Sequence, residues 1–544
     1  MGILSTIYAH WLALAIVSFG LYSLQTCVVY FRLRKIKGPW LTGISDWPHS
    51  LAMLSTRCHE WYAEANQKFG ECECFKTFMI QRRSSADTPS SISGPIVRVA
   101  PNIVITSSPK VWAHVNTHPG YRRSPWFYRA CRLGYRQENV FSCTDEELHS
   151  RKRKQMVAGL TIVGSQYSGR ENLEMEISID DQVRELVDLL RSKYISTQEA
   201  IVPVDLAQKV HYFTLDVITS IGHGNTFGLL RTDIDSEDYL KSSHDGLKLF
   251  NASLALGFSW LAHAPVIGPL ISPSRTDKRG IGKIMDMCFS HVDKRLANPD
   301  DKRSDMLASF IRHGLKGEEL RIESVEQLVA GTDTTSAGLR GALLHIITNP
   351  RVYRKLQEEA DGAVRGGTVP KAGEGIITST QAKRLPYLQA VVRETLRVWP
   401  PVADIFPRDV PQGGDTVEVE SGESVHLPGG VGIGYSAHAM HRNEEIYGSD
   451  AKSFRPERWF ESDTAKLTAM LRTNDLTFGH GRFQCLGKVV AHMELGKLLF
   501  EIVRNFDIAL IDPTKPWKAR NYMGLFVISD MWVQVMEREE QVDG

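Results

Sequence analysis

A single cysteine near the C-terminal end of this 544-residue chain constrains its fold more than any other feature. Cys485 lies in the run Phe478-Gly-His-Gly-Arg-Phe-Gln-Cys-Leu-Gly487, where Gly481 precedes it by four residues and Gly487 follows it by two. Glycines make turns that side chains would block, so the backbone of such a run can pass close under a flat ligand. The helix predicted over residues 488 to 505 would direct its positive N-terminal end at the sulfur and favour the thiolate. This pattern predicts an axial ligand of haem iron, and the alternative is a buried free cysteine beside a glycine-rich turn.

Composition excludes some classes of function. The chain is 42% hydrophobic, which is enough for a large core, and its formal net charge is only +1. A nucleic-acid partner would call for a strongly basic balance, so we expect none. The eight cysteines have no regular spacing, which argues against a disulfide framework and fits a reducing compartment.

The N-terminus predicts a membrane anchor. Residues Ile3 to Phe31 contain no Asp, Glu, Lys or Arg, and this stretch exceeds the roughly 20 residues that a membrane-spanning helix needs. Basic residues follow at once, between Arg32 and Lys37, which places the rest of the chain in the cytosol by the positive-inside rule. A cleaved signal peptide is the alternative, but its basic residues should come first. We therefore predict an anchor with a basic stop over residues 1–37.

Hydrophobic periodicity predicts a mainly helical fold with a minor β-sheet. The expected helices are Leu173 to Tyr194, Ile281 to Ala297, Glu323 to Thr348, Arg351 to Val364, Thr380 to Val398 and Val489 to Asn505. The expected strands are Ile96 to Val99, Thr416 to Val419, Gly430 to Tyr435, Asp507 to Ile511 and Leu525 to Val533.

The cysteine run resembles the cysteine loop of the cytochrome P450 haem-thiolate monooxygenases. Phe478, Gly481, Cys485 and Gly487 match the pattern of that family position by position. The resemblance implies haem b as the cofactor, with these residues around it, and one cytochrome P450 catalytic domain over residues 38–544.

One position departs from the family pattern. The family usually has Arg or His two residues before the cysteine, near a haem propionate, whereas this chain has Phe483 there and Arg482 one place earlier. This order resembles fungal members. The propionate partners that the resemblance implies are Arg408, the His149/Arg153 pair and Arg482. The alternative for these basic residues is solvated surface charge, and residues 151–154 with Lys488 could instead dock an acidic reductase.

A second segment, Ala330-Gly-Thr-Asp-Thr-Thr-Ser336, resembles the family's oxygen-activation motif. It lies in an otherwise apolar helical stretch, where Gly costs about 1 kcal/mol and each Thr up to about 0.7 kcal/mol relative to Ala. We expect a helix that is locally opened, with room for dioxygen at Gly331 and proton delivery by Asp333 and Thr334. The alternative is a Ser/Thr-rich kink in a buried helix.

Three charged residues are predicted to be structural. Glu394 and Arg397 are three apart on one expected helix and so share a face. Arg458 follows at the separation where the family supplies a second arginine to that pair. We expect a buried network of the three that holds the cysteine loop, rather than a surface ion pair.

Residues 71–93 interrupt the family pattern, in which Lys-Phe-Gly usually runs straight into Pro-Ile-Val-Arg. Gly70-Glu71-Cys72 permits the splice donor GTGAGT, and Ser93-Gly94 permits an acceptor ending in CAG. Our hypothesis is a retained intron, and the alternative is a genuine surface insertion, which loops tolerate at little cost.

The resemblance implies a monooxygenase that oxidises a lipophilic small molecule. By analogy with fungal members only, we expect a role in the biosynthesis of a secondary metabolite, a terpenoid or polyketide. The resemblance also implies a separate NADPH-cytochrome P450 reductase as electron donor and a single-pass location in the endoplasmic reticulum membrane. Two alternatives stay open: a haem-thiolate isomerase or dehydratase that needs no reductase, and a non-catalytic haem protein.

Overall fold

The computed structural model describes residues 2–70, 95–160, 174–298 and 303–538. By their contacts the residues form two compact units, Met1–Ser124 with Ile405–Met440, and Pro125–Asp404 with His441–Gly544. The insertion predicted at residues 71–93 lies outside the described residues. The single catalytic domain over 38–544 therefore stays a prediction.

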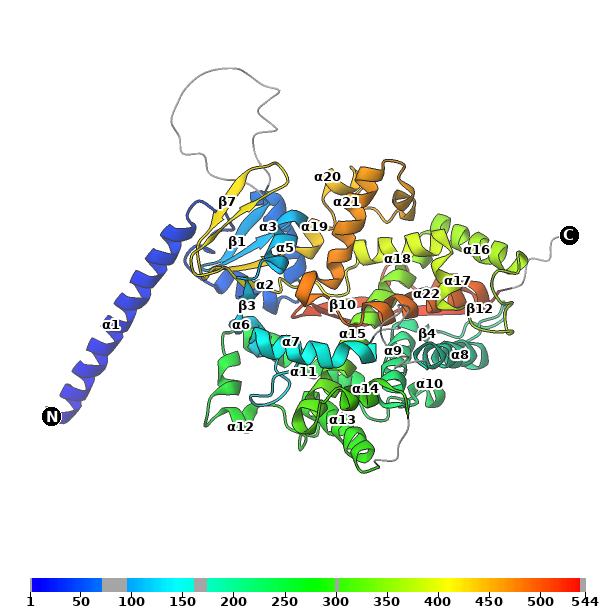
Figure 1. Ribbon diagram of the computed structural model, residues 1–544, viewed down its shortest axis with the longest axis horizontal. Helices are drawn as coiled ribbons and strands as arrows, with labels where there is room; N and C mark the ends of the chain where they lie inside the picture. The colour runs from blue at the N-terminus through cyan, green and yellow to red at the C-terminus, as the bar shows by residue number, and fades with distance from the viewer. Residues whose placement is uncertain (1, 71–94, 161–173, 299–302, 539–544) are drawn as a thin grey trace, which may run out of the picture. The chain divides into compact units, whose positions relative to one another are not determined.

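Both units mix helices and strands, with most of the helices in the second (Figure 1). The first unit contains the helices α1 (Gly2–Leu33), α2 (Trp47–Leu54), α3 (Cys58–Gly70), α5 (Pro109–Thr117) and α19 (Ala437–Met440), and the strands β1 (Ile96–Ala100), β2 (Ile103–Thr106), β3 (Arg122–Arg123), β5 (Arg408–Asp409), β6 (Asp415–Glu418), β7 (Ser424–Leu427) and β8 (Gly432–Tyr435). The second unit contains the helices α6 (Pro125–Tyr128), α7 (Glu146–Met156), α8 (Met175–Lys193), α9 (Leu206–His223), α10 (Leu229–Thr232), α11 (Tyr239–Ala255), α12 (Gly268–Ile271), α13 (Gly280–Leu296), α14 (Met306–Arg312), α15 (Gly317–Ile347), α16 (Pro350–Arg365), α17 (Ser379–Lys383), α18 (Pro386–Val398), α20 (Glu444–Tyr447), α21 (Thr464–Asp475) and α22 (Lys488–Asn505). It also contains the strands β4 (Val204–Asp205), β9 (Phe506–Leu510), β10 (Lys518–Tyr522), β11 (Leu525–Ser529) and β12 (Trp532–Glu537), and short 3₁₀ helices that include η3 (Ser259–His263), η4 (Pro456–Phe460), η5 (Leu476–Phe478) and η6 (Gly481–Phe483).

The first unit is built on a five-stranded sheet in the order β1-β2-β8-β5-β3. β2 and β8 run parallel, with Ile103 opposite Gly432, and the other neighbours are antiparallel. Every residue of β1 is buried, because α2 and α3 pack against it. A strand covered in this way reads as a continuous apolar run, which is why the sequence identified it.

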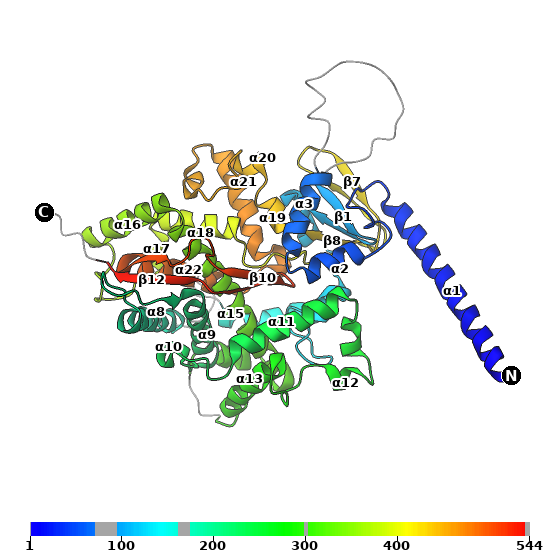
Figure 2. The ribbon, with the colours of Figure 1, turned by 180° about the vertical axis from the view of Figure 1, so that it is seen from behind.

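The second unit is organised around α15, which packs against α9, α13, α18 and α22. Nearly all of its side chains between Leu320 and Ile346 are buried. A helix with so little exposed surface forms the centre of a helical core. Figure 2 shows α11 and α13, which also pack together, from the opposite side. The mainly helical fold with a minor sheet is confirmed.

Two predicted elements are each divided in the structure. The helix expected over Thr380 to Val398 is two helices, α17 and α18, because Pro386 has no N–H to donate and restricts the residue before it. The strand expected over Leu525 to Val533 is interrupted at Asp530, which has a φ of 59°. This turn lets β11 pair with β10 while β12 pairs with β9 and β4.

The N-terminal helix α1 contains a candidate membrane span. In the described part of the chain, Ala13–Leu33 is the one helical stretch long and apolar enough to cross a bilayer, with a mean hydropathy of 1.6 over its window. The span lies near the N-terminus, where a signal sequence would have the same character. Its length and composition are compatible with a membrane anchor.

Candidate active site

The cysteine loop is a sharp turn that ends at the start of α22. The N–H of Cys485 donates to the carbonyl oxygen of Phe478 at 2.7 Å, which closes the loop. Gly479 and Gly481 have φ angles of 72° and 58°, which favour glycine. A Cβ atom at Gly479 would also lie 2.8 Å from the carbonyl oxygen of Phe483. The sequence analysis identified Gly481, whereas the need for glycine at 479 follows only from the closed loop.

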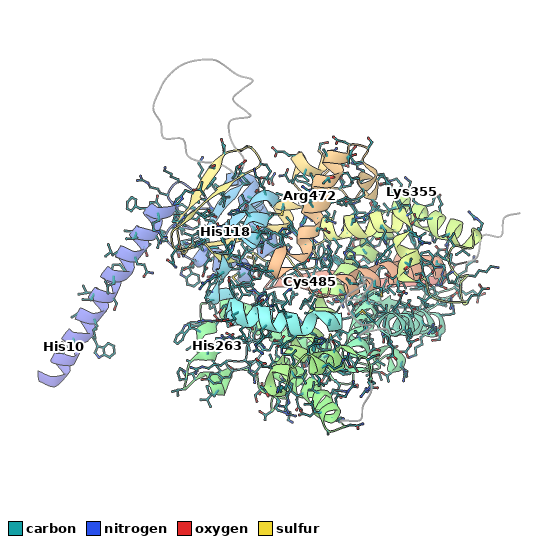
Figure 3. The ribbon with its side chains drawn as sticks, in the orientation of Figure 1. His10, His118, His263, Lys355, Arg472 and Cys485 are labelled. Atoms are coloured by element: carbon teal, nitrogen blue, oxygen red, sulfur yellow. The ribbon has the colours of Figure 1, made fainter. Side chains whose placement is uncertain are left out.

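The Cys485 side chain is exposed, yet the atoms around it desolvate the thiol and raise its pKa. The backbone N–H groups of Gly487 and Lys488, at the start of α22, point at the sulfur and oppose this rise in pKa, as does the charge of Arg153. The next residue, Leu486, packs against a buried cluster of the second unit and fixes the loop. Figure 3 labels Cys485.

Helix α7 lies beside this loop and carries two of the predicted propionate partners. The ring of His149 packs against that of Phe483, with 5.6 Å between the centroids. Phe483, which departs from the family pattern at this position, therefore packs on α7. Arg482 forms an ion pair with Glu146, at 3.1 Å.

Arg153 is a cation in α7 that is available to a ligand. Its guanidinium makes no hydrogen bond or ion pair with any residue in the described ranges, although it is only half-exposed. Burial lowers its pKa, and the nearby Cys485 opposes that effect. The guanidinium of Arg153 is partly desolvated and could bind a carboxylate, and the nearby Cys485 thiol could bind a metal. The two side chains therefore fit a ligand that carries both a metal and a carboxylate.

Arg408, the remaining predicted propionate partner, belongs to the first unit. It is buried, and it donates to the carbonyl oxygen of Phe406 at 2.7 Å and to Oδ1 of Asn116 at 3.4 Å. Its predicted role stays a prediction.

The local opening expected in the helix at residues 330–336 is not present, because α15 is continuous there. The hydroxyl groups of Thr332 and Thr334 each donate to the carbonyl oxygen four residues earlier, at 2.7 Å. Such bonds satisfy polar groups inside a buried helix without interrupting it.

Gly331 has a packing role in this structure. A Cβ atom at this position would lie 2.7 Å from the side chain of Ile218 in α9, so glycine is what lets the two helices approach. The sequence analysis had assigned this glycine to dioxygen. The exposed position is instead Ala330, which is one turn before Thr334 and shares its face. The spacing of four residues could have identified Ala330 from sequence.

Asp333 points away from that face. It is buried, and its Oδ2 accepts a hydrogen bond from Ser243 Oγ at 2.9 Å. Its Oδ1 lies 3.1 Å from Nε2 of His211. Neither partner was identified from sequence, because they lie on α11 and α9.

Glu394, Arg397 and Arg458 form one fully buried network. Arg397 donates to the carboxylate of Glu394 through two nitrogens, Nη2 at 2.7 Å and Nε at 2.9 Å. Arg458 Nε donates to the same carboxylate at 3.0 Å. The indole N–H of Trp459 adds a bond at 3.1 Å, and the backbone N–H of Arg455 adds another at 2.8 Å. The carboxylate is thus fully satisfied, as a buried charge must be.

His441 links this network to the cysteine loop. Arg397 donates to the carbonyl oxygen of His441 at 2.8 Å. The Nε2 atom of His441 lies 3.2 Å from Oγ1 of Thr477, in the turn η5 that ends at Phe478. The sequence analysis gave His441 no role. The fully buried His441 therefore connects Glu394, through Arg397, to the loop.

Acid is expected to destabilise the protein through buried histidines. Burial lowers the pKa of His441 and of His223 from 6.5 to about 3, so both stay neutral in the fold. Between pH 6.5 and 3 the unfolded chain binds more protons, so stability is complete above pH 6.5 and falls as the pH decreases. Each histidine contributes about 1.4 kcal/mol per pH unit, or about 2 kcal/mol by pH 5. Thermal unfolding at pH 7.5 and pH 5 measures this loss, and equal melting temperatures would contradict it.

Comparisons with known proteins identify the family of this chain. The sequence model of the family Cytochrome P450 matches residues 93–531. The chain is 35% identical over 540 residues to the cytochrome P450 monooxygenase ABA1 of Pyricularia oryzae, covering 97% of each chain. It is 36% identical over 452 residues to the cytochrome P450 monooxygenase aba1 of Botryotinia fuckeliana, covering 82% of this chain and 85% of that one. It is 29% identical to the cytochrome P450 monooxygenase gsfF of Penicillium aethiopicum, covering 79% and 83%. The chain therefore belongs to the cytochrome P450 family, as a monooxygenase that carries haem b on a cysteine thiolate.

Proposed function

We propose that this monooxygenase oxidises a lipophilic small molecule, a terpenoid or polyketide of fungal secondary metabolism, with electrons from NADPH delivered by a separate reductase. The observation that carries the proposal is the Cys485 thiol, which is accessible and receives two backbone N–H groups. The similar proteins from fungi support the metabolic setting.

The residues present fit haem b. Cys485 would supply the axial thiolate, and the turn through Phe478, Gly481 and Gly487 would let the macrocycle approach the backbone. Four basic side chains are the candidates for the propionates: Arg153, His149, Arg482 and Arg408. When bound, the haem supplies dioxygen activation and the transfer of one oxygen atom to the substrate.

Thr334 and Asp333 are the residues that we assign to proton handling. The hydroxyl of Thr334 can hold a proton at Oγ1 on the exposed face of α15, next to Ala330. Asp333 is the adjacent carboxylate, and it would take up a proton from solvent and relay it to Thr334 Oγ1 once it turns toward that face. Positioned acids of this kind contribute about 10²–10⁴-fold to a rate.

Expression with a reductase tests the proposed function. We expect a ferrous carbon monoxide spectrum typical of a haem thiolate, and dioxygen consumption that depends on NADPH. Metabolite profiling of the expressing strain then identifies the substrate class. A normal spectrum without NADPH-dependent dioxygen use would favour the isomerase or dehydratase alternative, and no reaction with any reductant or hydroperoxide would favour a non-catalytic haem protein.

Replacing Arg153 with alanine is expected to weaken haem binding about tenfold to a hundredfold. The charge-assisted hydrogen bonds that the guanidinium can offer a propionate are worth about 1.5–3 kcal/mol. Arg153→Lys should lose less, because lysine keeps the charge without the paired donors. Haem transfer to an excess of a haem-scavenging protein measures the effect. Arg151, which is exposed and paired with Glu319, is the matched control, and an equal loss in Arg151→Ala would contradict the assignment.

We also propose that the protein is located at the endoplasmic reticulum membrane, with the catalytic part in the cytosol, and α1 supports this location.

A second apolar surface also supports membrane contact. Phe258, Trp260, Val266, Leu270 and Ile271, on and around η3 and α12, are 52% to 82% exposed. Exposed apolar side chains that cluster in this way mark interaction surfaces.

Removing the anchor is therefore expected to leave some membrane binding. A chain lacking residues 1–37 should still sediment with vesicles of microsomal lipid, and W260D/L270D should abolish that binding. I201D/I234D is the matched control, since both of its residues are about as exposed but lie elsewhere. Equal binding by the two double variants would contradict a membrane role for this surface.

A further inference from the structure

Two side chains that no motif of the sequence includes lie against the carboxylate of Asp333. Its two carboxylate oxygens lie 2.9 Å from Ser243 Oγ and 3.1 Å from His211 Nε2. The three side chains are almost completely buried, with exposures of 6% for Asp333, 2% for Ser243 and 7% for His211. Buried polar groups of this kind keep fixed partners, because an unpaired charge in the interior is costly.

The groups around His211 come from several elements. From α15 it faces Asp333 and Arg340, from α11 Tyr239, and from the segment before α11 Asp235. Burial and the charge of Arg340 lower the pKa of His211, whereas Asp333 and Asp235 oppose the change.

The cation nearest to this pair is engaged elsewhere. Arg340 is 2% exposed, and its Nε and Nη2 both donate to the carbonyl oxygen of Ala207, at 2.8 and 2.6 Å. Its donors are therefore directed at the start of α9. The direct contacts of the Asp333 carboxylate remain the imidazole and one hydroxyl.

These contacts fix the direction of Asp333 relative to Thr334. Neighbouring residues on an α-helix point about 100° apart, so the two side chains face different sides of α15. Thr334 Oγ1 donates to the carbonyl oxygen of Ala330 on the exposed face, whereas the carboxylate is held toward α9 and α11. Asp333 reaches Thr334 only if it leaves at least one of its two partners.

We propose that His211 is the positioning residue of Asp333: together with Ser243 it holds the carboxylate and sets how readily that group turns to relay a proton from solvent to Thr334 Oγ1. This inference rests on the proposed function, because it assumes that Asp333 handles protons. It assigns no contact between His211 and the haem or the substrate. The imidazole acts only through the carboxylate that it touches.

The test compares H211Q, S243A, D333N and the double variant H211Q/D333N in the full-length chain with a reductase and NADPH. We expect H211Q to slow NADPH oxidation at least about fivefold and to raise its solvent deuterium isotope effect, as D333N does. The double variant should be no slower than D333N alone, because residues that act as one unit are not additive. S243A should change the rate in the same direction as H211Q by a smaller factor, since a hydroxyl is the weaker partner of a carboxylate.

His223 provides the matched control. It is a second buried histidine on α9, 5% exposed, and it contacts Cys288 and His291 instead of Asp333. H223Q should melt at a lower temperature and keep the wild-type isotope effect. A melting-temperature cycle with H211Q, D333N and the double variant gives a readout that is independent of turnover, and we expect its shifts to be non-additive.

A wild-type isotope effect in H211Q would overturn the inference, even with a lowered melting temperature. So would additive melting-temperature shifts, because they would mean that His211 and Asp333 do not interact. Failure of the proposed function looks different, since the wild-type protein would then show no thiolate-type carbon monoxide spectrum.

Discussion

Replacing Glu394 with alanine is expected to give protein without haem, rather than a slow enzyme. The carboxylate accepts bonds from Arg397, Arg458, Trp459 and the Arg455 backbone. Its removal leaves the buried guanidinium of Arg397 without a counter-ion and leaves Arg458 with Asp450 as its remaining carboxylate partner. Breaking one partner of a buried charged pair costs about 3–5 kcal/mol, a large part of the stability of a typical protein.

The effect should reach the cysteine loop through His441, which contacts both Arg397 and Thr477. The ratio of haem absorbance to protein absorbance, measured with the melting temperature, checks this. Glu444→Ala is the matched control, because Glu444 is exposed on α20 and surface changes usually stay within about 0.5 kcal/mol. Normal haem content in Glu394→Ala would show that the loop does not depend on the network.

Replacing Cys485 with alanine is expected to abolish the ferrous carbon monoxide spectrum of a haem thiolate. The side chain is the candidate axial ligand, and the exposed sulfur receives the N–H groups of Gly487 and Lys488. Alanine removes the sulfur and keeps the backbone, so the fold should persist with a secondary-structure spectrum close to that of the wild type. Activity should fall to the background of a reaction without enzyme, because the ligand that tunes the iron is lost.

Cys131 offers a control for this prediction. It is half-buried in a different part of the second unit, where Sγ contacts the carbonyl oxygen of Phe127 at 3.4 Å. Cys131→Ala should keep the full spectrum. An unaltered spectrum in Cys485→Ala would mean that another side chain binds the iron, and the assignment of the site would then be wrong.

Local spacing in the sequence was sufficient to identify the elements that carry the site. Gly481, Cys485 and the start of α22 lie within a few residues of one another, so the geometry of one turn and one helix end constrains them. Glu394 and Arg397 share a helical turn in the same way. Hydrophobic periodicity alone did not predict where the elements at Pro386 and Asp530 divide. A proline or a positive φ ends a helix or strand, while the spacing of apolar residues continues past it.

The sequence by itself determined the family, the mainly helical class and the residue types of the site, because these depend on contacts between near neighbours in the chain. Only the tertiary structure decided which distant side chains complete that site. His211 meets Asp333 because α9 packs on α15, and this packing also requires glycine at position 331. The link through His441 arises in the same way, from segments that are far apart in sequence. Such contacts depend on how whole helices pack, and the local pattern of residues does not contain that information.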